Sequence, residues 1–215
     1  MKNKILLSFY KTLCITCLFI ASSLFFVSFA EGDPEVELSV QIESGSLEIG
    51  FLDASSEPIA EPSVTMSAID YSATDVGTST GTLGTDPQWI GVANNTGTTP
   101  EWTLSIGATG GASAVWSDGS GKTMPFNSAD SDDGTLTIVH DNTTISGEVG
   151  ETGITKGSTA SFLSGESYVP ITLVTAGSTA PDGGAWSVKN IGLSQTVPIL
   201  QEVATYTLDL TLTIT

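Results

Sequence analysis

Few residues of this 215-residue chain are suited to catalysis. His140 is the single histidine, which excludes zinc sites built from several imidazoles and leaves one candidate base for a hydrolase of the Ser-His-Asp type. It follows the apolar alternation of Leu136 and Ile138. We therefore expect His140 to end a strand and cap a loop, without a catalytic role.

A second set of residues could hold a metal ion. The run Asp130-Ser131-Asp132-Asp133-Gly134 concentrates carboxylates on a glycine-containing turn, and Asp118 precedes another glycine nearby. Calcium prefers clustered oxygen ligands of this kind, although the run lacks the later Glu of an EF-hand loop. Two interpretations stay open, a solvated acidic turn or a calcium site whose ligands are Asp118, Asp130, Asp132 and Asp133.

Other catalytic arrangements find little support. Paired carboxylates hydrolyse glycosides, but pairs arise by chance in a chain with 24 acidic residues. No Gly-x-Ser-x-Gly elbow stands between a predicted strand and a predicted helix. We expect a protein that is not an enzyme, and a glycan-active enzyme remains the enzymatic alternative.

The first 30 residues resemble an export leader. Lys2, Lys4 and Lys11 precede a long apolar stretch from Leu13 to Val27, and Ser28-Phe29-Ala30 offers a small-x-small cleavage site. This order predicts a secretory signal peptide over residues 1–30, formed as a helix and removed on export. A retained membrane anchor is the alternative, because about 18 apolar residues are enough to span a bilayer.

Removal of the leader changes the charge and the cysteine content. The formal charge of the whole chain is −18, and the segment after the leader keeps three Lys, no Arg and all 24 acidic residues. Such a surface cannot neutralise phosphates, which excludes nucleic acid and anionic membrane surfaces as partners. Both cysteines, Cys14 and Cys17, lie in the leader. Disulfides and thiolate chemistry are therefore excluded from residues 31–215.

Apolar and polar residues alternate along short segments of residues 31–215. Alternation with period two places one set of side chains on each face of a strand. The predicted strands span residues 35–43, 47–52, 64–69, 89–93, 101–106, 136–140, 169–176, 186–193 and 204–215. Glycine-rich turns separate the predicted strands. Residues 94–100 are short enough to join the strand at 89–93 to the strand at 101–106 as a hairpin. We predict an all-β domain, an antiparallel β-sandwich of about nine or ten strands.

Two tryptophans differ in their predicted surroundings. Trp102 shares its strand face with Leu104 and Ile106, which predicts a position in the core. Trp116 stands beside the Asp118 turn, and we expect it to be exposed.

The strand Glu101-Trp102-Thr103-Leu104-Ser105-Ile106 resembles the WxL domain of bacterial surface proteins. Family members typically carry a second Trp-x-Leu motif in the last strand, where this chain reads Leu212-Thr213-Ile214. The resemblance implies a secreted β-rich module that attaches non-covalently to the cell wall. It makes Trp102, Leu104 and Trp116 the candidate residues for binding wall polymer or a partner protein.

These observations predict a secreted, non-enzymatic protein of the cell surface. It would associate with cell-wall polymer or with neighbouring surface proteins, without stable membrane insertion once the leader is removed. The alternative is a structural subunit of a surface layer or fibre, in which edge strands such as 35–43 or 204–215 pair between copies of the chain.

Overall fold

The computed structural model describes residues 40–41, 43, 45–98, 101–130, 132–163 and 168–215. The chain divides into two compact units, residues 1–42 and 43–215, and the strands of the described residues belong to the second. The predicted signal peptide lies outside the described residues, as does most of the predicted strand 35–43. Residues 40, 41 and 43 are described and belong to no strand.

The described residues form strands, one short 3-10 turn η1 (Gly111–Ser113) and no α-helix. None of them builds a helix long and apolar enough to cross a bilayer. The strands are β1 (Leu47–Leu52), β2 (Gly77–Leu83), β3 (Trp89–Asn94), β4 (Trp102–Ala108), β5 (Trp116–Ser117), β6 (Thr123–Met124), β7 (Leu136–Val139), β8 (Thr144–Gly147), β9 (Ile154–Lys156), β10 (Ala160–Ser161), β11 (Ile171–Ala176), β12 (Gly184–Lys189), β13 (Ile191–Val197) and β14 (Leu210–Ile214).

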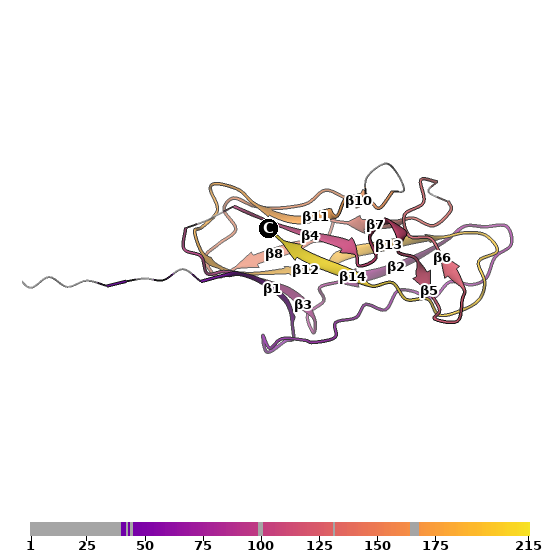
Figure 1. Cartoon of the computed structure of the whole chain (residues 1–215), viewed down its shortest axis with the longest axis horizontal. Helices are drawn as coiled ribbons and strands as arrows, with labels where there is room; N and C mark the ends of the chain where they lie inside the picture. Colours follow the sequence, from indigo (N-terminus) through magenta and orange to yellow (C-terminus); the bar gives the residue numbers. More distant parts are fainter. Residues whose placement is uncertain (1–39, 42, 44, 99–100, 131, 164–167) are drawn as a thin grey trace, which may run out of the picture. The chain divides into compact units, whose positions relative to one another are not determined.

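The strands pair into four antiparallel sheets, ordered β1-β3-β12-β8, β10-β7-β13-β2, β14-β4-β11-β9 and β5-β6 (Figure 1). The predicted all-β, antiparallel class is confirmed, and the arrangement is sandwich-like. The strands in the described residues number fourteen rather than nine or ten. Part of the excess is β5, β6 and β10, which are two residues long and too short to show alternation in a sequence.

The first two sheets form one bent surface. The chain passes from β2 into β3, from β7 into β8 and from β12 into β13. Each of these three strand pairs has one strand in each of the two sheets, and the pairs are neighbours, so they bend together. The bend in β12–β13 falls on Asn190, whose φ of 60° is left-handed and whose N–H donates to Gly84 O (3.0 Å). Asparagine tolerates this conformation better than most residues. The single strand predicted over 186–193 is therefore wrong, because Asn190 divides it.

The core lies between this bent surface and the sheet of β4. Trp102 of β4 and Trp186 of β12 meet with ring centroids 5.6 Å apart, and they are 2% and 1% exposed. Such tilted aromatic pairs combine large apolar burial with favourable ring geometry. The predicted core position of Trp102 is confirmed. A second aromatic group, Phe126, Phe162 and Tyr168, packs with centroids 5.4–6.4 Å apart.

The predicted hairpin of residues 89–93 and 101–106 is wrong. β3 pairs with β1 and β12, whereas β4 pairs with β11 and β14, so the two lie in different sheets. Asn94 turns the chain out of β3, because its side-chain Oδ1 accepts bonds from the N–H and hydroxyl of Thr96 (3.1 and 2.7 Å). Alternation identifies which face of a strand is buried, but it does not identify the strand's partner.

The C-terminal strand is shorter than predicted. Only Leu210–Ile214 pairs with β4, with Leu210, Leu212 and Ile214 half-buried and the two threonines between them exposed. Residues 204–209 form no strand, and Thr207 makes an isolated bridge to Ser117. This irregular stretch forms part of the cavity described next.

Candidate binding site

Two of the three candidate binding residues lie inside the core. Trp102 is 2% exposed and Leu104 is fully buried, both on the face of β4 that meets Trp186. Neither offers surface to a polymer or a partner in this structure. The Trp-x-Leu strand therefore serves packing here, and Trp116 is the candidate that remains.

Trp116 is half-buried on β5 rather than fully exposed. Its indole N–H donates to the Oε1 of Gln195 on β13 (2.8 Å). Gln195 is only 1% exposed, and its amide nitrogen donates to Pro125 O (3.2 Å) and Thr196 O (2.7 Å). A buried amide with all these bonds has one orientation, so Gln195 fixes the Trp116 ring in place.

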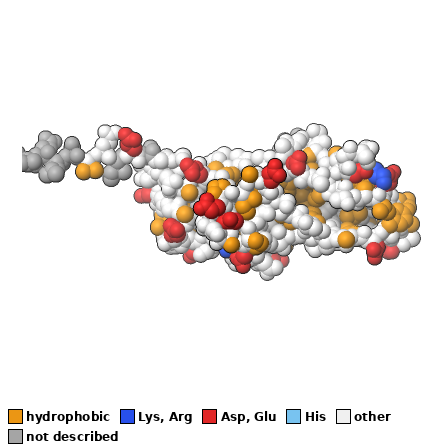
Figure 2. Space-filling model, turned by 90° about the horizontal axis from the view of Figure 1, so that it is seen from below, with side chains coloured by type: hydrophobic (Ala, Val, Ile, Leu, Met, Phe, Trp, Pro, Cys, Tyr) orange, Lys and Arg blue, Asp and Glu red, His pale blue; other side chains and the backbone are white. Residues whose placement is uncertain are grey.

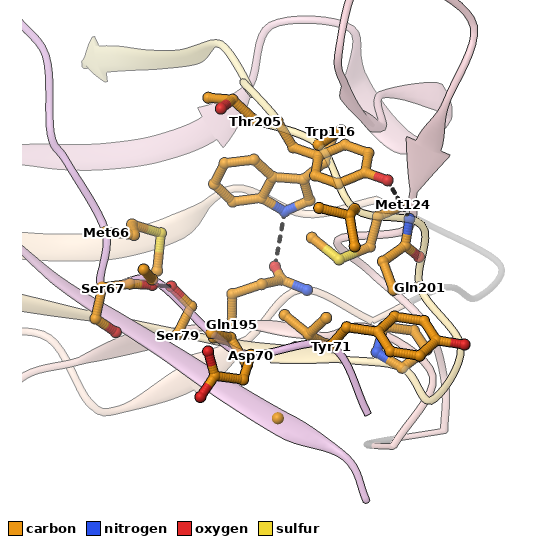
Figure 3. A pocket seen from close by; sticks show the side chains of 18 of the residues that line it. Met66, Ser67, Asp70, Tyr71, Ser79, Trp116, Met124, Gln195, Gln201 and Thr205 are labelled. Atoms are coloured by element: carbon orange, nitrogen blue, oxygen red, sulfur yellow. Dashed lines mark hydrogen bonds between the residues drawn. The ribbon is translucent and has the colours of Figure 1, made fainter. Parts of the chain in front are cut away.

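The fixed ring lines a cavity of about 560 Å³, within the usual range for ligand pockets (Figure 3). Its floor is the ends of β2 and β13. Its walls are residues 63–72, which we call the strap, residues 198–207, which we call the crossover, and the β5–β6 hairpin. The apolar lining is Val64, Met66, Ala68, Ile69, Tyr71, Trp116, Met124, Val197, Pro198, Val203, Ala204 and Tyr206.

The strap is the predicted strand 64–69, and that prediction is wrong. Ser67 N–H donates to Thr80 O of β2 (2.7 Å), but Thr80 N–H donates to the Ser67 hydroxyl (2.9 Å) and not to a backbone carbonyl. The Ser67 carbonyl accepts from the Ser79 hydroxyl (2.6 Å). Serine side chains compete with ladder bonds in this way. The alternation is nevertheless visible in burial, because Val64 and Met66 are half-buried and Thr65 and Ser67 are exposed.

Ser79 also belongs to a pattern that resembles a nucleophile elbow. Gly77-Thr78-Ser79-Thr80-Gly81 matches Gly-x-Ser-x-Gly, yet all five residues lie within β2. A nucleophile elbow requires a sharp strand-to-helix turn. The Ser79 hydroxyl is instead buried and bonded to the strap.

Side chains attach the crossover to the β5–β6 hairpin. Gln201 donates to Thr123 O (3.1 Å) and to the Tyr206 hydroxyl (2.7 Å), which in turn donates to Glu202 O (2.7 Å). Lys122 donates to Val203 O (2.9 Å) and lies 3.6 Å from the Glu202 carboxylate. Backbone bonds hold the crossover at two further points, because Leu200 N–H donates to Ser72 O (2.9 Å) and Thr207 forms an isolated bridge with Ser117.

Large apolar side chains are exposed on the strap and on the crossover, and three of them, Ile69, Tyr71 and Val203, line the cavity. Ile69 and Tyr71 of the strap are 36% and 58% exposed, and Ile199, Leu200 and Val203 of the crossover are 46%, 58% and 76% exposed. We call these five residues the rim. Figure 2 shows apolar side chains gathered toward the end of the unit where Figure 1 draws β5 and β6. Clustered exposed apolar side chains are typical of interaction sites.

Two of the four acidic residues proposed as metal ligands accept hydrogen bonds within their own turns. The Asp118 carboxylate accepts from the N–H groups of Ser120 and Lys122 (2.8 and 2.9 Å) and from the Ser120 hydroxyl (2.5 Å), which lowers its pKa. Asp130 Oδ1 accepts from Asp132 N–H (3.1 Å). Within the described ranges, no three His, Cys, Asp or Glu side chains gather around a common point. The calcium prediction thus rests on the sequence alone.

His140 follows the last residue of β7, as predicted for a strand end, and is 2% exposed. Burial of the ring, together with the nearby positive charge of Lys156, lowers the pKa of His140 below its ordinary value of 6.5. Lys156 Nζ also donates to His140 O and Asp141 O (2.7 and 3.1 Å). The Lys156 ammonium thus joins β9 to the turn between β7 and β8.

Sequence reasoning missed the cavity, although one signal was present. On β13 the inward positions read Ile191, Leu193, Gln195 and Val197, so an amide interrupts an apolar series. A buried amide requires partners, and here they are Trp116, Pro125 and Thr196. No protein-family model matches the sequence, and no curated protein and no solved structure shows significant similarity to the chain.

Proposed function

We propose that this protein is an exported, non-enzymatic component of the cell surface that attaches non-covalently to a neighbouring surface protein through the cavity beside β2. The observation that carries the proposal is the cavity with its apolar rim, five large side chains exposed by 36–76%. The export leader predicted over residues 1–30 brings the domain to the surface.

The lining favours a protein segment as the occupant. The walls are mostly aliphatic, thioether and aromatic, with a few amide and hydroxyl groups such as Gln201 and Thr205. An extended segment with apolar side chains on one face fits such a site, and backbone bonds to an edge strand add affinity. The domain's strong negative charge favours partners that bind by apolar contact over partners that bind by acidic groups.

Cell-wall polymer is a second candidate, in keeping with the resemblance to the WxL domain. Trp116, Tyr71 and Tyr206 all line the cavity, and flat aromatic side chains with a polar tip suit the apolar faces of sugar rings. Retention of the exported protein on purified peptidoglycan, lost in Trp116→Ala, would favour this candidate over a protein partner.

The rim provides the test. The double variant Leu200→Ser/Val203→Ser removes the exposed Val203 side chain from the cavity lining and the exposed Leu200 side chain from the same crossover, without touching the core. We expect the fraction of exported protein that stays on intact cells to fall and the fraction in the medium to rise.

The matched control is Leu163→Ser/Val169→Ser, whose side chains are 57% and 67% exposed and do not line the cavity. The control should keep the wild-type distribution between cells and medium. Equal release of both double variants, or release of neither, would contradict a role for the cavity in attachment.

A further inference from the structure

Two aromatic side chains of the cavity lining use their polar ends inside the protein. The Trp116 indole N–H donates to Gln195 Oε1 (2.8 Å). The Tyr206 hydroxyl accepts from Gln201 (2.7 Å) and donates to Glu202 O (2.7 Å). An indole has one hydrogen to donate and a phenol has one, so neither ring can donate to a ligand. Both rings therefore present carbon surface to the cavity.

Three carboxylates line the cavity, and they differ in their partners. Glu202 lies 3.6 Å from Lys122 Nζ. Asp75 Oδ2 accepts from the Thr74 hydroxyl (2.9 Å). The exposed Asp70 carboxylate makes no hydrogen bond or ion pair with any residue that the structure describes. Asp70 is therefore the charged group of the lining that is available to a ligand.

Asp70 and Tyr71 are consecutive residues of the strap, and both line the cavity. In Figure 3 they are drawn below Gln195, and the Trp116 ring is drawn above it. Tyr71 is 58% exposed, and Asp70 is exposed as well. The cavity thus combines carbon surface with a negative charge at its solvent-exposed side.

The described part of the chain does not supply a cation for Asp70. Residues 31–215 contain three Lys and no Arg, and none of these lysines lines the cavity. Lys122, Lys156 and Lys189 each donate to an acceptor other than Asp70. Residues 43–215 of a second copy would offer the same engaged lysines. The counter-charge therefore comes from a different protein.

We propose that the cavity binds a lysine or arginine side chain, carried on an apolar segment of the neighbouring surface protein, with its cationic group at Asp70. This inference rests on the proposed function and names the chemistry of its partner. Long cationic side chains lay their methylene stem along apolar surface and keep the charged head in a polar place. Here the stem contacts the apolar lining and the head reaches Asp70, where Tyr71 offers an aromatic face to the cation.

Two blocked tripeptides, Leu-Lys-Leu and Leu-norleucine-Leu, are the probes, because norleucine keeps an aliphatic stem and lacks the ammonium group. The NMR shift of the Trp116 indole N–H follows their binding to the exported protein, since Trp116 lines the cavity. We expect the lysine peptide to bind about two to five times more tightly at low salt, as for an exposed ion pair. Salt screens the pair, so the difference should shrink as the salt concentration rises.

Removal of the carboxylate tests the role of Asp70. Asp70→Asn should bind the two peptides equally, and Asp70→Lys should prefer Leu-Glu-Leu to Leu-Lys-Leu. The matched control is Asp182→Asn, an exposed aspartate outside the cavity. It removes the same charge from the unit and should keep the wild-type preference for lysine. An undiminished lysine preference in Asp70→Asn, no preference in the wild type, or an unchanged Trp116 signal with both peptides would overturn the inference.

The rim variant separates this inference from the proposed function, because its readout is retention on cells. If Leu200→Ser/Val203→Ser is released while the wild type binds both peptides equally, the cavity attaches an uncharged segment and only the cationic assignment falls. If the rim variant stays on the cells like its control, the proposed function falls and this inference falls with it.

Discussion

Two regions of the second unit use β-strands in opposite ways. Around Trp102 and Trp186, large side chains alternate along strands that are paired on both sides, and the ring centroids lie 5.6 Å apart in the core. Around the cavity, β2 presents Gly77, Ser79 and Gly81, and the Ser67 side chain replaces a ladder bond. The first region has the contacts that give stability, whereas the second leaves a cavity lined by apolar side chains. Stability and attachment are therefore separable by mutation.

Replacement of Trp102 by Ala should have the largest effect on stability. The substitution removes a 2% exposed ring and leaves Trp186 beside a void, and large-to-small changes of buried aromatic residues cost about 3–5 kcal/mol. Urea unfolding followed by tryptophan fluorescence measures the loss. If Trp102→Ala lowered the free energy of unfolding no more than Trp116→Ala, the two regions would not differ as described.

Replacement of Gln195 by Leu should have an intermediate effect. The variant keeps the volume but leaves the Trp116 indole N–H and Pro125 O without their partner, and unpaired buried polar groups cost about 1–3 kcal/mol. Trp116 should become more mobile, which lowers its fluorescence anisotropy. The double variant Gln195→Leu/Trp116→Phe removes the orphaned indole and should recover part of the loss. An absence of recovery would show that the bond does not position Trp116.

The His140 site should make stability depend on pH. The folded pKa lies below the unfolded value of 6.5, so the unfolded chain binds more protons and stability falls as the pH drops below about 6.5. Above that pH both states are neutral at this position and the contribution is complete. Urea midpoints measured between about pH 5.5 and 7.5 should show this slope in the wild type, and His140→Gln should flatten it. An equal slope in both would assign the dependence to other groups.

Replacement of Ser67 by Ala should have the smallest effect on global stability. Ser67 lies on the exposed strap, and loss of its hydroxyl removes one bond from Thr80 N–H, worth about 0.5–1.5 kcal/mol. Hydrogen exchange at the Thr80 amide should nevertheless accelerate, while amides of β4 keep their rates. Ser178→Ala, at another exposed serine, serves as the control. An unchanged Thr80 rate would mean that the strap is held by other contacts.

The sequence predicted elements that alternate large apolar residues, and missed those built from small ones. β1, β3, β4, β7 and β11 lie where alternation placed them. β2 reads Gly-Thr-Ser-Thr-Gly-Thr-Leu, which carries almost no apolar signal, because its side chains make room for the strap instead of filling the core. Its strand pairing depends on β13, far along the chain, and short-range patterns do not contain that information.

The candidate site was harder to predict for a related reason. Its place beside a turn makes Trp116 a candidate in the sequence, but the role of Trp116 depends on Gln195, 79 residues away. A motif makes Trp102 and Leu104 candidates, and the same alternation that predicts their strand buries them. The cavity joins the strap, the crossover and a hairpin, three segments that only the folded chain brings together.

The central claim is that the cavity beside β2 is an attachment surface. The distribution of the exported protein between intact cells and medium, compared for the wild type and Leu200→Ser/Val203→Ser, tests it most directly. The account predicts that this variant is released into the medium while Leu163→Ser/Val169→Ser stays on the cells. Equal retention of the two variants would contradict it.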